Sequence, residues 1–245
     1  MTGGRRTLRL DTLHEGRPYD PFREALYTPL ELLAPSLTDP SRSLDEAIFD
    51  HYARTGGSQP DLMESLARRV HDYSIDEALL EVIGRRSLDR ERVVGIMGGH
   101  SVLRSDRWYR EVARLTCRLR GAGFRVMTGG GPGIMEAANV GAYVAGGFGL
   151  QELEDVLERL GRVPAPPKGK DWERNPDATL TYQAYQSAAR DVLDHYPRAA
   201  IVTADQVQNL AVPTWFYGWE PTNLFADRVA KFFSNSLRED GLLSV

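Results

Sequence analysis

The sequence predicts an α/β fold, a doubly wound parallel sheet with an N-terminal helical extension. Two short apolar runs, at residues 93–97 and 124–127, have the composition of strands that are buried on both faces. A glycine-rich loop follows each run, and apolar residues at helical spacing follow each loop. Strand, loop and helix thus occur twice in succession, which is typical of parallel sheets whose strands are connected by helices.

The composition narrows the class of protein. The 245 residues are 42% apolar and 26% charged, which is ordinary for a globular chain. Acidic residues outnumber basic ones by 34 to 30, so the net charge is −4. This charge argues against a nucleic-acid partner, although a local basic patch stays open. Cys117 is the single cysteine, which excludes an internal disulfide and a zinc site made of several cysteines.

Hydropathy gives no sign of a membrane protein. No apolar run approaches the roughly 18–20 residues that a membrane span needs. The N-terminal residues lack the apolar block of a secretory signal. We therefore expect a cytoplasmic protein with no membrane partner.

The chain divides into three predicted segments. Residues 1–42 are polar and interrupted by prolines, which favours an extended arm. Residues 43–90 carry apolar residues at helical spacing and are predicted to form a helical lobe. Residues 91–245 are predicted to form the α/β domain.

Caps, apolar spacing and chain breakers predict the individual elements. Ser43 and Glu46 occupy capping-box positions, and Asp61 and Asp106 precede two further helices. The predicted helices lie at 62–70, 75–83, 106–120, 134–143, 150–160 and 180–193, with a final helix capped by Asn223 and running past Leu237. Later strands are predicted at 199–203 and 210–216, and residues 242–245 resemble the start of another strand.

The strongest local signal is the glycine loop at residues 128–136, with the sequence TGGGPGIME. Gly129, Gly130, Gly131 and Gly133 allow the backbone to turn with positive φ and to approach a ligand closely. The first amides of the following helix have no internal partner, and they lie at the positive end of the helix dipole, which suits a phosphate. The pattern is neither GxxxxGK[ST] nor a clean GxGxxG, which disfavours a Walker nucleotidase and a conventional NAD site. A tight turn without a ligand is the alternative.

A second glycine loop follows the first strand and contains Gly98, Gly99, His100 and Ser101. The carboxyl ends of neighbouring parallel strands face one crevice, so we expect both loops to converge there. Ser101 is a candidate to hydrogen-bond a phosphate or a ribose. His100 is interpreted mainly as a surface or capping residue, and a catalytic role is the less favoured alternative.

Two polar residues follow the glycine loop at positions that share one helix face, Glu136 and Asn139. Glu136 is a candidate to hold a ribose hydroxyl or to act on a glycosidic bond. The alternative is that its charge only complements the positive start of the helix.

These residues carry a resemblance to a known family. Residues 93–142 resemble the LOG family, once described as lysine decarboxylases, in the strand that runs into Gly98, in Tyr109, and above all in residues 129–139, GGGPGIMEAAN. The resemblance implies a Rossmann-like fold, a homodimer or larger homo-oligomer, and no metal or redox cofactor. It implies a phosphoribohydrolase, which converts a nucleoside 5′-monophosphate into a free base and ribose 5-phosphate. It also implies a phosphate loop at residues 129–133, with Glu136 and Asn139 in the pocket.

A longer branch of the family, which has an N-terminal helical extension, shares residues 212–221 and Asn223. The family's second signature, PGGxGTxxE, supplies the glutamate usually held to be catalytic, and it does not occur in the 245 residues. A natural short form, a shortened chain and the product of a damaged gene stay open as explanations. The alternative to an enzyme is therefore a non-catalytic nucleotide-binding protein, acting as a sensor or a subunit.

A different carboxylate would have to serve if the chain is catalytic. Glu220 lies at the end of a predicted strand, on the crevice side, and is a candidate for acting on the glycosidic bond. Trp215, Tyr217 and Trp219 alternate just before it and are candidates to stack on a base. Core or dimer contacts are the alternative for these aromatic residues.

Further charged residues are expected at the surface. Arg238 is expected at a solvated helix end. Lys168 and Lys170 are expected in a flexible loop, with a phosphate contact as the less favoured alternative. A homodimer is expected also because the strand edges of the predicted sheet need a cover.

Overall fold

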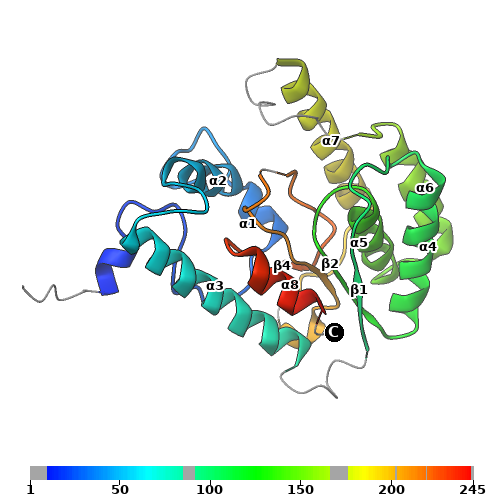
Figure 1. The fold of residues 1–245 in the computed structure, drawn as a ribbon. Helices are drawn as coiled ribbons and strands as arrows, with labels where there is room; N and C mark the ends of the chain where they lie inside the picture. The colour runs from blue at the N-terminus through cyan, green and yellow to red at the C-terminus, as the bar shows by residue number, and fades with distance from the viewer. Residues whose placement is uncertain (1–9, 85–91, 166–175, 202, 219, 244–245) are drawn as a thin grey trace, which may run out of the picture.

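The structure, a computed structural model, describes residues 10–84, 92–165, 176–201, 203–218 and 220–243. Within these ranges the chain forms a mixed α/β fold around one four-stranded, all-parallel sheet (Figure 1). The elements in chain order are η1 (Leu10–Leu13), α1 (Pro29–Leu33), α2 (Leu44–Arg54), α3 (Leu62–Ile83), β1 (Val93–Ile96), α4 (Arg107–Gly121), β2 (Arg125–Thr128), α5 (Ile134–Ala145), α6 (Leu150–Gly161), α7 (Pro176–His195), η4 (Ala204–Gln206), β3 (Asn209–Ala211), β4 (Arg228–Val229) and α8 (Asn235–Leu243).

The strands follow one another in the sheet in the order β1-β2-β3-β4. Successive side chains of a strand point to opposite faces, and β2 shows what each face contacts. Val126 packs with Ala138 and Ala142 of α5, whereas Met127 belongs to the large cluster that includes α3. Helices therefore cover both faces of the sheet, with α4 to α7 on one side and α3 and α8 on the other (Figure 1). Among the described helices, none is long and apolar enough to cross a membrane.

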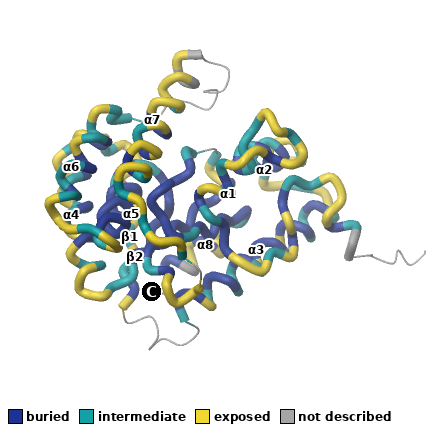
Figure 2. The backbone as a smooth tube through the Cα atoms, turned by 180° about the vertical axis from the view of Figure 1, so that it is seen from behind, coloured by how far each residue is buried: buried dark blue, intermediate teal, exposed yellow. Residues whose placement is uncertain are grey.

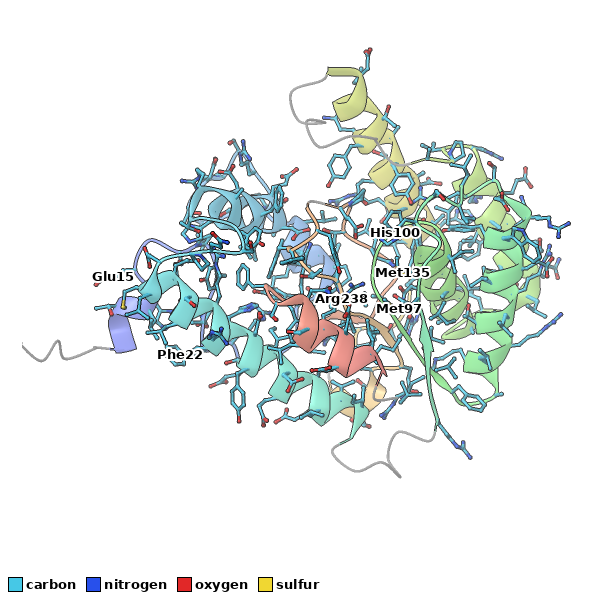
Figure 3. All side chains as sticks on the ribbon, viewed as in Figure 1. Glu15, Phe22, Met97, His100, Met135 and Arg238 are labelled. Atoms are coloured by element: carbon cyan, nitrogen blue, oxygen red, sulfur yellow. The ribbon has the colours of Figure 1, made fainter. Side chains whose placement is uncertain are left out.

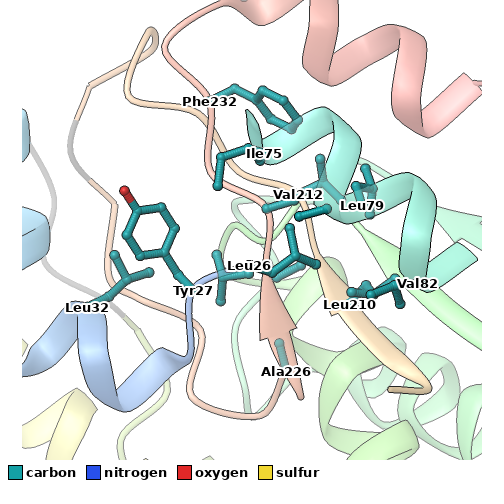
Figure 4. Close-up of a cluster of buried hydrophobic side chains, with 14 of the residues drawn as sticks. Leu26, Tyr27, Leu32, Ile75, Leu79, Val82, Leu210, Val212, Ala226 and Phe232 are labelled. Carbon is teal, nitrogen blue, oxygen red and sulfur yellow. The ribbon is translucent and has the colours of Figure 1, made fainter. Parts of the chain in front are cut away.

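The larger core lies between α3 and the sheet (Figure 4). Ile75 and Leu79 of α3 and Leu210 of β3 are fully buried in it. The N-terminal segment also enters this core, because Tyr27 is 1% exposed and pairs with Val229 of β4 through two backbone hydrogen bonds of 3.0 and 2.8 Å. This pairing covers the β4 edge of the sheet.

The opposite edge of the sheet is open within the described ranges. There β1 pairs with β2 alone, Gly95 is exposed, and the Met97 side chain just after the strand is 47% exposed. Figure 2 shows the exposed outer surfaces of α4 and α6 on the same side of the molecule as β1. The sheet is thus protected on both faces and at one edge.

Several sequence predictions of helix starts are confirmed. Ser43 and Glu46 form the capping box of α2, and Asp61 and Asp106 accept backbone amides at the starts of α3 and α4. The two stretches predicted at 62–70 and 75–83 are one continuous helix, α3.

The predictions for the last third of the chain are partly wrong. The helix predicted at 180–193 lies within α7, and the strand predicted at 210–216 overlaps β3, which ends at Ala211. Residues 199–201 and 203, however, form no strand. The predicted helix from Asn223 does not form, because this segment holds β4 and α8 begins only at Asn235. Phe225 and Phe232 are both fully buried, so their helix-like spacing reflects burial on all sides rather than a helix face. Residues 242–243, predicted to start a strand, belong to α8.

Candidate functional site

The two glycine loops touch each other at the carboxyl ends of β1 and β2. The carbonyl oxygen of Gly99 accepts hydrogen bonds from the amides of Val102, at 3.1 Å, and Ile134, at 3.3 Å. A Cβ atom on Gly133 would lie 2.1 Å from this oxygen, and a Cβ on Gly99 would lie 2.3 Å from the Ile134 side chain. Both glycines also have φ above +70°. The close approach therefore requires glycine at both positions.

A buried amide network holds the second loop from below. Thr128 Oγ1 accepts the amide of Gly130 at 3.0 Å and donates to Asn139 Oδ1 at 2.7 Å. Asn139 is fully buried, and its amide also bonds Asn209 and Asn223, at 2.6 and 2.8 Å. The structure thus places Asn139 beneath the loop, where it positions Thr128 rather than facing a ligand.

Glu136 lies in a closed polar cluster. Its carboxylate accepts hydrogen bonds from Arg104 Nε at 2.9 Å and from the hydroxyls of Tyr109 and Tyr185 at 2.9 and 2.7 Å, and Arg104 Nη2 bonds the second oxygen. Burial alone would raise the pKa of Glu136, but the charge and hydrogen bonds of Arg104 and the bonds of both tyrosines outweigh it, and the pKa lies below its ordinary value. Glu136 is therefore an ionised, saturated carboxylate that joins α4, α5 and α7.

A second carboxylate, Glu220, lies at the open side of the loop. Its Oε1 atom is 3.0 Å from His100 Nε2, and the two side chains are 32% and 54% exposed. A Cβ on Gly131 would lie 2.9 Å from His100 Nε2 and 3.0 Å from Glu220 Oε2, so the pair stands directly over the loop. The hydrogen bond to Glu220 raises the pKa of His100 above its ordinary value, against burial and the nearby charge of Arg238.

Arg238 is the residue that the sequence analysis missed. It was expected at a solvated helix end, yet it is only 6% exposed. Its Nε donates to the Val212 carbonyl at 2.9 Å and its Nη1 to Asn235 Oδ1 at 3.1 Å, while Nη2 points at Gly129, where a Cβ would lie 2.6 Å away. No carboxylate of the described residues lies within ion-pair distance of it. The burial of Arg238 was not predicted because the start of α8 was predicted wrongly.

Figure 3 shows Met97, His100, Met135 and Arg238 gathered in one region beside the sheet. The two methionine sulfurs would lie 2.9 and 2.8 Å from a Cβ on Gly129, so the loop has an apolar wall as well as charged groups. We call this region, formed by His100, Glu220, Arg238 and the loop 129–133, the loop mouth.

The start of α5 opens toward the loop. No side chain caps this helix, and of its first three amides only that of Ile134 has an acceptor among the described residues. The positive end of the helix dipole and the guanidinium of Arg238 thus act on the same loop. Such an arrangement attracts an anion, and the uncompensated charge of a buried arginine gains most from one.

The remaining candidates lie in different settings. Gly98 has a φ of +90°, and Ser101 is exposed. Trp215 is fully buried in the core, whereas Tyr217 is exposed, with its ring 5.9 Å from Arg238 Cζ. Trp219, Lys168 and Lys170 lie outside the described residues.

The segment that carries Glu220 is fixed by the helical lobe. Asp45 of α2 accepts hydrogen bonds from Thr222 Oγ1 at 2.9 Å and from Trp215 Nε1 at 2.8 Å, and it forms a buried ion pair with Lys231 at 2.6 Å. Sequence reasoning missed this contact, since no local pattern connects residue 45 with residues near 220. Asp45 therefore does not contact Glu220 itself but fixes side chains on both sides of it, Trp215 and Thr222.

A cavity of about 640 Å³ lies elsewhere, between α3 and the start of α8, and Arg68, Tyr73 and Phe233 are among its walls. None of the glycine-loop residues lines it. Among the described residues, no group of three or more His, Cys, Asp or Glu side chains gathers as a metal site would require. No family model, curated protein or solved structure matches the chain.

Proposed function

We propose that this chain is a LOG-like phosphoribohydrolase with a Rossmann-like fold, which binds the phosphate of a nucleoside 5′-monophosphate in the loop mouth. The supporting observation is Arg238, a buried guanidinium that points at Gly129 and has no carboxylate partner within the described ranges. A phosphate there would compensate the charge of Arg238 and would lie near the uncapped start of α5. The proposal needs no metal or redox cofactor.

The proposed reaction breaks the bond between the ribose C1′ atom and a base nitrogen. Positive charge develops on the ribose as this bond lengthens, so a carboxylate close to C1′ stabilises the transition state. Glu136 is a poor candidate because its carboxylate already accepts hydrogen bonds from Arg104, Tyr109 and Tyr185. Glu220 is the better one, because its Oε2 faces the space over Gly131.

The second candidate function is a nucleotide-binding protein without turnover, acting as a sensor or subunit. The saturation of Glu136 favours it, since the carboxylate one turn into α5 is committed to structure. Both candidates share the same binding mode, so binding and turnover must be measured separately.

We further propose a cytoplasmic homodimer or larger homo-oligomer, supported by the open edge at β1. Light scattering of micromolar protein should then show at least twice the chain mass.

The deciding experiment combines base release with thermal stabilisation. Purified protein is incubated with AMP, GMP, CMP and UMP, and free base is measured by chromatography. Binding at 100 times the dissociation constant stabilises the fold by about 2.7 kcal/mol, which raises the melting temperature by about 5–10 °C. Stabilisation with base release supports the enzyme, and stabilisation without release supports the binding protein. If the nucleotides neither stabilise the protein nor release a base, both candidate functions are contradicted.

A matched pair of variants locates the site. Gly131→Leu places a side chain between Met135, His100 and Glu220, whose ends can move aside, so the fold should persist while the loop mouth is blocked. Gly121→Leu adds the same side chain where nothing lies within 4 Å. We expect Gly131→Leu to abolish the stabilisation by nucleotide and Gly121→Leu to keep it. Equal stabilisation of both variants would place the site elsewhere.

A further inference from the structure

Hydrolysis at C1′ requires a water molecule that loses a proton as it attacks, and the proposed function leaves the acceptor of that proton unassigned. We propose that His100 is this general base and that Glu220 orients it while stabilising the charge on the ribose. The inference rests on the proposed function. Its basis is the geometry of the pair over Gly131.

The pair has the arrangement of an oriented base. Glu220 Oε1 lies 3.0 Å from His100 Nε2, so in the neutral imidazole the proton resides on Nε2 and the lone pair on Nδ1 is available. More than half of the His100 side chain is exposed to solvent. The second oxygen of Glu220 remains free to face the ribose. One carboxylate can thus serve both partners, through different oxygens.

The protons and electrons of the step balance. The water oxygen forms a bond to C1′ and gives a proton to His100 Nδ1. The electron pair of the C1′–N bond moves to the base, which takes up a proton from solvent or, in a second step, from the imidazolium. The products are ribose 5-phosphate and the free base, and His100 returns to its neutral form.

The charged groups around His100 fix the sign of the pH dependence. Glu220 contacts it from the segment before β4 and raises its pKa, while Arg238 approaches from α8 and lowers it. The net result is a pKa above the ordinary 6.5. A base acts only when it is unprotonated, so activity should fall as the pH drops through a value above 6.5. Activity that persisted well below pH 6.5 would instead argue against a histidine base with a raised pKa.

The experiment measures base release in single turnover from pH 4.5 to 9, with the nucleotide that the wild type cleaves best. His100→Gln keeps a donor for Glu220 but cannot accept a proton from water. We expect it to lower the rate about 10²–10⁴-fold while the dissociation constant of the nucleotide changes less than threefold. Glu220→Gln should lower the rate and move the acid limb to lower pH, because the carboxylate no longer raises the pKa of His100.

The control is His14→Gln, which alters an exposed histidine 3.5 Å from Asp20. The His14 ring lies 5.4 Å from that of Phe22, and Figure 3 shows Phe22 well apart from His100. It should leave rate and pH profile unchanged. A wild-type rate and profile in His100→Gln would overturn the role of His100 and leave the proposed function intact. A wild-type acid limb well below pH 6.5 would also overturn it. Absence of base release by the wild type would overturn the proposed function, and this inference with it.

Discussion

Glu136 and Glu220 both lie within reach of the same glycine loop, and their surroundings differ in one respect. Glu136 is buried with Arg104, Tyr109 and Tyr185, and its two oxygens receive four hydrogen bonds. Glu220 is partly exposed, and within the described part of the chain its carboxylate pairs with His100 alone, at 3.0 Å. A carboxylate whose bonding capacity is filled can hold elements together but cannot bind a substrate. The difference in saturation leaves Glu220, and not Glu136, with an oxygen that could meet a ligand.

The two arginines repeat this contrast. Arg104 and Arg238 are both almost fully buried, but Arg104 has a carboxylate partner and Arg238 has none among the described residues. A buried charge without a partner is costly, so the loop mouth keeps an unfavourable feature that an anion would relieve. Replacing Arg104 should therefore lower the stability of the protein. Replacing Arg238 should instead weaken the binding of an anion.

The largest expected effect is on stability, in Arg104→Met. The substitution leaves the Glu136 carboxylate buried without its cation, which should lower the free energy of unfolding by about 3–5 kcal/mol. Urea unfolding measures it. Arg114→Met is the control, because Arg114 pairs with Glu154 at the surface and its loss should cost less than about 1 kcal/mol. A similar loss of unfolding free energy in both variants would mean that the buried cluster stabilises the fold no more than a surface ion pair does.

An intermediate effect is expected for Arg238→Met, and it concerns binding. The variant loses two hydrogen bonds but also an uncompensated buried charge, so the unliganded protein should keep its unfolding free energy within about 2 kcal/mol. The stabilisation by nucleoside monophosphate should disappear. Thermal melts with and without AMP test both statements. Full retention of the AMP effect would remove Arg238 from the site.

The smallest effect on stability is expected for Glu220→Gln. Its carboxylate is partly solvated and its partner His100 is mostly exposed, so the change in unfolding free energy should stay below about 0.5 kcal/mol. Glu136→Gln, measured beside it in urea, should be several-fold more destabilising. Equal destabilisation by the two substitutions would refute the distinction between a saturated and an open carboxylate.

The sequence predicted the first two-thirds of the fold better than the last third. The helix caps and the strands near residues 93 and 125 follow from local signals, namely capping residues, apolar runs and glycine stops. In the last third, Phe225 and Phe232 are buried from every side, so their spacing carries no information about a helix face. The spacing of apolar residues predicts elements that have one buried and one solvent-exposed face, and this part of the chain has few of them.

The sequence predicted the local geometry of the glycine loop, but not the side chains that surround it. The glycine pattern correctly indicated a loop that follows a strand and begins a helix. It could not show that Glu136 is saturated, because Arg104 and Tyr185 approach from other elements. Nor could it show that Arg238 turns inward, since this depends on where α8 begins. Partners that come from distant segments leave no trace in the local sequence.

The contacts of Asp45 have a consequence for the order in which the protein is assembled. They join residues that are 170, 177 and 186 positions apart along the chain. Contacts of such separation form late, because a long loop must close before they can. During synthesis the lobe would emerge long before Lys231 exists, and Asp45 would wait without its counter-ion. The segment that carries Glu220 can thus be fixed by Asp45 only after Lys231 has been made.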